Sequence, residues 1–135
     1  MSYEHQPPAI TILTLLQVPP TGGDTAWVSQ AAAYERLSPP IQQLLQGLRA
    51  VHSAFPQAEG AARDGKHVRR APVISRHPIV RVHPATGEKA LFVNPGFTKS
   101  IEGLKEEESD ALLKLLFTVW IPIFSVLQSC VIGSI

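Results

Sequence analysis

Cysteine is almost absent from this chain of 135 residues, which narrows the classes of protein it can belong to. A single residue, Cys130, cannot form an internal disulfide or supply a cysteine-rich zinc site. The chain also lacks an excess of positive or negative charge, because its formal net charge is only +1. That balance gives no electrostatic reason to expect nucleic acid or a membrane surface as partner. We therefore expect a reducing compartment and no nucleic acid.

An apolar leader is lacking from residues 1–8, which are polar. Without a signal peptide we expect a cytoplasmic location. Internal repeats are lacking as well, and the twelve prolines are spread along the chain, which favours many short elements. The apolar fraction of 44% is ordinary for a globular protein and indicates one domain with a modest core.

Short β-branched and alternating runs predict a fold that is mainly β with flanking helices. Residues 9–16 lie between prolines and predict a strand buried on both faces. A turn follows, and residues 25–28 return as a second short strand. Residues 77–84 predict a third strand, which pairs as a hairpin with residues 89–93.

Three stretches have helical character: residues 29–37, residues 38 to about 54, and residues 102–117. In the second, Ser38 suits the cap, and an apolar stripe predicts the buried face: Ile41, Leu44, Leu45 and Leu48. The third begins with acidic residues, which the helix dipole favours. Its expected apolar face is Leu112, Leu113, Leu116 and Phe117.

Two segments leave alternatives open. Residues 56–72 are small and polar, and we expect a mobile surface loop there in preference to a basic patch for an anionic partner. Residues 115–135 carry no charge and are long enough to span a bilayer, which needs about 20 apolar residues. Pro122 and Gln128 weaken that interpretation, so we favour an apolar tail of translated non-coding sequence over an anchor.

The residues predict no catalytic or metal site by themselves. His77 and His83 flank one predicted strand and would lie about 20 Å apart at ~3.3 Å per residue, too far to share a metal ion. No Ser-His-Asp set or phosphate-binding glycine loop stands out. In the turn at residues 19–27, we assign Asp24 to the turn and Trp27 to the core.

Four separated motifs, taken in order, resemble the taurine catabolism dioxygenases, a family that depends on iron(II) and 2-oxoglutarate. They are PPTGGDTAW (19–27), LSPPIQQLLQGLRAVH (37–52), HPIVRVHPATGEKALFVNPGFT (77–98) and EEESDALLKLLF (106–117). The resemblance covers residues 1–117 as a partial dioxygenase domain. It leaves residues 118–135 as an uncharged apolar tail unrelated to the family.

The resemblance implies an oxidoreductase with a double-stranded β-helix, or jelly roll, here incomplete. The family's iron ligands lie on a strand before the matched part and again after the acidic helix, so the chain resembles the middle of the enzyme without either metal-binding end. We therefore expect no metal ligand and no catalytic residue in this chain. Iron(II) and 2-oxoglutarate are implied for the family, but we do not expect this chain by itself to bind them. The implied substrate is a small sulfonate such as taurine, or a related acid.

Three site residues carry over by position. Thr25 matches a threonine whose hydroxyl binds the distal carboxylate of 2-oxoglutarate, the alternative being a strand residue beside a turn. Phe97 matches an aromatic residue of the substrate pocket, with core packing as its alternative, and Tyr3 is expected to line the same cavity. Two other hypotheses stay open: a catalytically silent truncated product, and a tail-anchored remnant that serves as a binding module.

Overall fold

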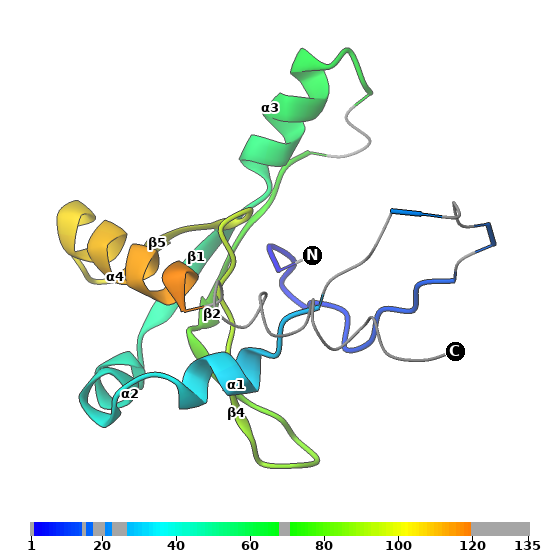
Figure 1. Ribbon diagram of the computed structural model, residues 1–135. Coiled ribbons are helices and arrows are strands. Elements are labelled where there is room, and N and C mark those ends of the chain that lie inside the picture. The colour runs from blue at the N-terminus through cyan, green and yellow to red at the C-terminus, as the bar shows by residue number, and fades with distance from the viewer. Residues whose placement is uncertain (1, 15, 18–20, 23–26, 68–70, 120–135) are drawn as a thin grey trace.

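The structure is a computed structural model that describes residues 2–14, 16–17, 21–22, 27–67 and 71–119. Three of its four helices lie in the first half and four of its five strands in the second (Figure 1). In chain order they are α1 Gln30–Glu35, α2 Pro39–Leu45, β1 Arg49–Ser53, α3 Phe55–Arg63, β2 Ile74–Pro78, β3 Val80–Val82, β4 Lys89–Leu91, β5 Thr98–Ile101 and α4 Glu106–Thr118. The predicted mixture of strands and flanking helices is therefore found as a small α/β arrangement with antiparallel sheets.

The central sheet has three strands in the order β2-β1-β5, and β3 pairs with β4 in a second, two-stranded sheet. The β3-β4 hairpin confirms the predicted pairing, with Val80 opposite Leu91. The single strand predicted over residues 77–84 is wrong, however, because His77 belongs to β2 and pairs with β1. The two strands are separated by Ile79, whose side chain is fully buried and whose amide donates to the Leu48 carbonyl.

Strand β1 occupies residues that were predicted as the end of the second helix. That helix, α2, starts after Ser38 as expected but ends at Leu45. Gly47 follows with a φ of 85°, a conformation that glycine adopts without strain and that ends the helix. The predicted stripe is also wrong at Leu44, which is 54% exposed, whereas Leu45 is fully buried.

Helix α3 replaces the first half of the loop predicted for residues 56–72. Pro56 stands in its first turn, where a missing amide costs nothing, and alanines favour the helical conformation that follows. The predicted surface position is confirmed, because the helix contains no buried residue and projects from the sheet (Figure 1). Residues 68–70, with two of the predicted basic side chains, lie outside the described part.

The strand predicted over residues 9–16 is wrong for residues 9–14, which form no strand. The side chains expected to be buried are instead exposed: Ile10, Ile12, Leu13 and Leu16 are 79%, 85%, 56% and 95% exposed. A β-branched run forms a strand only where a second strand offers hydrogen bonds, and none of the described strands pairs with it. Trp27 is 64% exposed, so its assignment to the core is also wrong.

Other predictions fall on residues outside the described part, namely residue 24, residue 25, most of the strand predicted over 25–28 and most of the tail. Among the described residues, no helix combines the length and apolar character that a membrane span needs.

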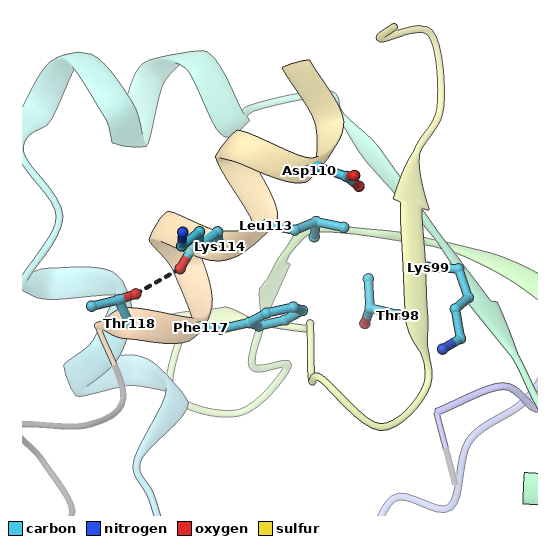
Figure 2. Close-up of a pocket in the computed structure, with 7 residues that line it drawn as sticks. All are labelled: Thr98, Lys99, Asp110, Leu113, Lys114, Phe117 and Thr118. Carbon is cyan, nitrogen blue, oxygen red and sulfur yellow. Dashed lines mark hydrogen bonds between the residues drawn. The ribbon is translucent and has the colours of Figure 1, made fainter. Parts of the chain in front are cut away.

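Helix α4 packs along β5 and closes the core. Its acidic start and its apolar face are confirmed, with Leu113 and Leu116 buried. Figure 2 shows Leu113 and Phe117 pointing toward Thr98, while Lys99 extends from the other side of β5. Buried Ser109 accepts a hydrogen bond from the Ile101 amide at 2.9 Å, which ties the helix to the end of the strand.

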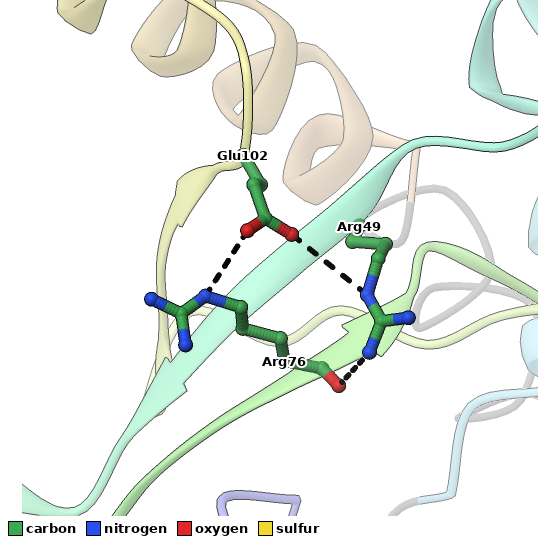
Figure 3. A network of polar contacts seen from close by, with 3 residues as sticks. All are labelled: Arg49, Arg76 and Glu102. Carbon is green, nitrogen blue, oxygen red and sulfur yellow. Dashed lines mark hydrogen bonds and ion pairs between the residues drawn. The ribbon is translucent and has the colours of Figure 1, made fainter.

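An ion-pair network crosses the outer face of the central sheet (Figure 3). Glu102 contacts Arg76 Nε at 3.2 Å and Arg49 Nε at 3.8 Å, and Arg49 Nη2 donates to the Arg76 carbonyl at 2.9 Å. These side chains are about half exposed, so each pair contributes at most about 1 kcal/mol. The network therefore adds little to the free energy of unfolding.

The exposed run formed by residues 10–14 and 16 predicts an aggregation-prone surface. We expect the substitution Ile12→Lys to reduce light scattering of the purified chain on heating. Its effect on the free energy of unfolding should stay within about 0.5 kcal/mol, since it removes no buried contact. The matched control is Ile79→Lys at a fully buried isoleucine, which should prevent folding. Unchanged aggregation by Ile12→Lys would show that this run is not the responsible surface.

Candidate functional site

Polar side chains occupy one half of the buried face of the central sheet. The register of β1 and β2 places His52 opposite Ser75, with His77 opposite Ala50, so the two histidines are diagonal neighbours on one face. Thr98 of β5 lies opposite His52 on the other side. All four polar side chains are at most 7% exposed. A buried polar cluster of this kind must satisfy its own hydrogen bonds.

The His52 imidazole joins the N-terminal segment to the loop before β5. Its Nδ1 lies 2.9 Å from Ser2 Oγ and 3.4 Å from Thr98 Oγ1. Asn94 Nδ2 donates to the same Ser2 oxygen at 2.8 Å. Ser2 Oγ accepts from Asn94 and still has its own hydroxyl hydrogen and a second lone pair, so it can hydrogen-bond a neutral His52 ring in either tautomer.

His77 holds the same segment two residues further on. Its Nε2 lies 2.8 Å from the Glu4 carbonyl oxygen and 2.9 Å from Ser75 Oγ. A carbonyl can only accept, so His77 Nε2 carries the proton and donates it to Glu4. Phe92 packs against both imidazoles, with ring centroids 5.4 Å from His52 and 5.3 Å from His77. Arg81 covers the Phe92 ring, with its guanidinium carbon 4.5 Å from the centroid.

The environment keeps His52 uncharged. Burial is the largest cause, the nearby His77 adds to it, and the Phe92 backbone offsets part, so that the pKa of His52 falls from 6.5 to about 4. The two ring centroids are 5.5 Å apart. His52 Nε2 is buried and has no partner of hydrogen-bond geometry among the described residues. A charge on this ring would therefore be poorly compensated.

Two of the three predicted site residues lie together beside this cluster. The rings of Tyr3 and Phe97 pack edge to face, with centroids 4.9 Å apart and planes at 78°. Tyr3 is buried, and its hydroxyl donates to Gln57 Oε1 of α3 at 3.1 Å. Phe97 is half-buried in the loop before β5. The third, Thr25, lies outside the described residues.

The described residues do not fit an iron ion. Nowhere among them do three or more side chains of histidine, cysteine, aspartate or glutamate gather as a metal would need. His77 is buried in β2 and His83 is exposed in the turn beyond β3, so these two do not flank one strand as predicted. The buried histidine pair has no carboxylate partner among the described residues, and His77 Nε2 already donates to the Glu4 carbonyl.

An open pocket of about 390 Å³ lies between β5 and α4 (Figure 2). Its lining is Thr98, Lys99, Asp110, Leu113, Lys114, Phe117 and Thr118. Thr98 Oγ1 already accepts from the Asn94 amide at 2.9 Å. The pocket therefore offers an apolar wall and ends of long side chains, which is a weak basis for a specific ligand site.

Sequence reasoning missed His52, the residue at the centre of the polar cluster. The sequence predicts the end of a helix at this position, and a helix gives no reason to expect residues 75 and 98 opposite it. The alternation of Arg49, Ala50, Val51 and His52 was the available signal, because every second residue of a half-buried strand faces inward.

Comparison with known proteins identifies the class of this chain. Residues 1–123 match the family described as taurine catabolism dioxygenase TauD, TfdA family. The chain therefore belongs to that family, which confirms the predicted resemblance.

Three relatives illustrate the match. A protein of Schizosaccharomyces pombe is 50% identical over 117 residues, which are 87% of this chain and 30% of that protein. The alpha-ketoglutarate-dependent sulfonate dioxygenase of Saccharomyces cerevisiae is 44% identical over 119 residues, 88% of this chain and 29% of that protein. The crystal structure of a taurine dioxygenase from Burkholderia xenovorans is 42% identical with a TM-score of 0.63, covering 79% of this chain and 34% of that one.

The chain thus spans about 30% of the length of the curated relatives it matches. The similarity extends to solved structures of the family, so the described helices and antiparallel sheets are those of part of a family domain.

Stability should fall as the pH drops from about 6.5 to about 4. In this window the unfolded chain protonates His52 before the folded chain does, so the free energy of unfolding decreases by up to about 3 kcal/mol. Above about pH 6.5 the ring is neutral in both states and the full free energy of unfolding is present. Below about pH 4 the ring is protonated in both states and this free energy falls no further. Urea unfolding as a function of pH measures it.

The substitution His52→Asn should flatten that pH dependence, because an amide does not titrate. The matched control is His67→Asn at an exposed histidine, which should keep the slope of the unsubstituted chain. An equal slope in His52→Asn and the unsubstituted chain would assign the effect to other groups.

Proposed function

We propose that this chain forms part of a 2-oxoglutarate-dependent dioxygenase domain with an incomplete double-stranded β-helix. The observation that carries the proposal is the family match over residues 1–123. Relatives named as sulfonate and sulfate ester dioxygenases support a small organic acid with a sulfur oxyanion as the substrate class. The edge-to-face contact of Tyr3 and Phe97 supports an apolar cavity wall for the carbon chain of such a substrate.

In this proposal the three predicted residues have two roles. The Thr25 hydroxyl donates to the distal carboxylate of 2-oxoglutarate, which orients the co-substrate. The Phe97 and Tyr3 rings line the substrate cavity and exclude water from it. Iron(II) is the cofactor the family implies. No group of three or more candidate ligands occurs among the described residues, and we assign no metal-dependent step to this chain.

The first experiment measures by isothermal titration calorimetry whether the chain retains any 2-oxoglutarate binding. Thr25→Val should weaken such residual binding about 10-fold or more, because a hydrogen bond to a charged group contributes roughly 1.5–3 kcal/mol. The matched control, Thr21→Val at an exposed threonine, should leave the affinity unchanged. If both variants bind as the unsubstituted chain does, Thr25 does not hold the co-substrate.

The second experiment measures turnover. With iron(II), 2-oxoglutarate and taurine, we expect the purified chain to form no succinate above a reaction without protein, since it spans about 30% of the relatives it matches. The full-length Saccharomyces cerevisiae relative serves as the positive control. Iron-dependent succinate formation by the chain alone would falsify the expectation of inactivity and assign the metal site to this sequence.

A further inference from the structure

The backbone on both sides of Tyr3 is held by hydrogen bonds to the central sheet. Before it, Ser2 Oγ lies 2.9 Å from His52 Nδ1. After it, the Glu4 carbonyl lies 2.8 Å from His77 Nε2. The two anchors are two residues apart in the chain, so they fix the direction in which the side chain between them points.

The loop that carries Phe97 is tied to the same cluster. Asn94 donates from Nδ2 to Ser2 Oγ at 2.8 Å, and its Oδ1 accepts from the Phe97 amide at 2.9 Å. A single side chain therefore connects the segment before Tyr3 with the backbone of Phe97. The Thr98 amide in turn donates to the Asn94 carbonyl at 3.0 Å, which closes the loop as a tight turn.

The anchors themselves are rigid. His52 lies on β1, the central strand, which pairs with β2 on one side and β5 on the other. His77 lies on β2, and both side chains are at least 93% buried. Site residues are oriented most accurately when their supports are locked by packing on regular strands. The exposed loops that meet at the Tyr3–Phe97 contact obtain this support from the sheet beneath them.

We propose that His52 and His77 are positioning residues, which clamp the backbone on either side of Tyr3 and so fix the ring pair of Tyr3 and Phe97 in the cavity wall. This inference rests on the proposed function for its meaning in substrate recognition. The clamp itself is a property of this chain and can be measured without iron or substrate.

The experiment uses the full chain labelled with 3-fluorotyrosine and ¹⁹F NMR, at a concentration below the onset of aggregation. The chain has two tyrosines, Tyr3 and Tyr34, so two resonances report separately on the clamp and on the core around α1. Tyr3→Phe assigns the resonances. Phe97→Leu should move the Tyr3 resonance alone, because it removes the neighbouring ring.

The decisive variant is His52→Leu, which keeps an apolar side chain in the core but removes the hydrogen-bond partner of Ser2. We expect the Tyr3 resonance to move toward that of a solvent-exposed tyrosine, with Tyr34 unchanged. His52→Asn should restore the original resonance, because its amide group lies near the position of Nδ1 and supplies both an acceptor and a donor for the Ser2 hydroxyl. The matched control, His83→Leu at an exposed turn, should change neither resonance.

An unchanged Tyr3 resonance in His52→Leu would overturn the proposal, as would an asparagine variant that behaves like the leucine variant. If His52→Leu instead moves both resonances, the fold has been lost and Ser2→Ala decides. This substitution removes the bridging hydroxyl without touching the sheet, and we expect it to move Tyr3 alone. A Ser2→Ala chain with both resonances in place would overturn the clamp. Failure of the proposed function would appear instead in 2-oxoglutarate binding.

Discussion

A neutral histidine buried in the central strand is the constraint on which the described structure depends. His52 pairs through its backbone with strands on both sides, so its ring cannot move to solvent without disrupting β1. Burial beside His77 makes a charge on the ring costly, and the buried Nδ1 of the neutral ring needs a hydrogen-bond partner. Ser2 is that partner, so a residue near the start of the chain is bound to the middle of the sheet.

The buried His52 also connects the core with the ring pair of Tyr3 and Phe97. Ala50 and Ile101 form the apolar half of the buried sheet face, which helices α1 and α4 help to cover. The other half is polar and contacts the N-terminal segment. Tyr3 meets Phe97 where these parts adjoin. In the function proposed above, this ring pair is the aromatic wall of the substrate cavity, and the sheet beneath it sets its orientation.

Sequence reasoning succeeded where local chemistry decides the structure and failed where distant partners decide it. Helix α2 starts after Ser38, acidic residues begin α4, and residues 84–87 form the turn that joins β3 to β4. The Ser38 side chain, however, makes no capping hydrogen bond. In contrast, the sequence predicts helix where β1 lies, because these residues form a strand only by pairing with β2 and β5, which come much later in the sequence. Residues 9–14 have strong β propensity, yet they remain exposed and unpaired among the described strands.

The candidate site divides in the same way. Tyr3 and Phe97 could be named from family motifs, and the structure places them together. The polar contacts beneath them could not be inferred, because they join residues 50 and 92 positions apart, as in His52 to Ser2 and Asn94 to Ser2. Pairings over such distances become visible only once the register of the sheet is known.

A double-mutant cycle between Ser2 and His52 tests the central claim most directly. The free energy of unfolding is measured at neutral pH for the unsubstituted chain, Ser2→Ala, His52→Leu and the double variant. A direct hydrogen bond between the two side chains predicts a coupling energy of about 1 kcal/mol. Additive effects, with a coupling energy near zero, would contradict the view that His52 anchors the N-terminal segment to the sheet.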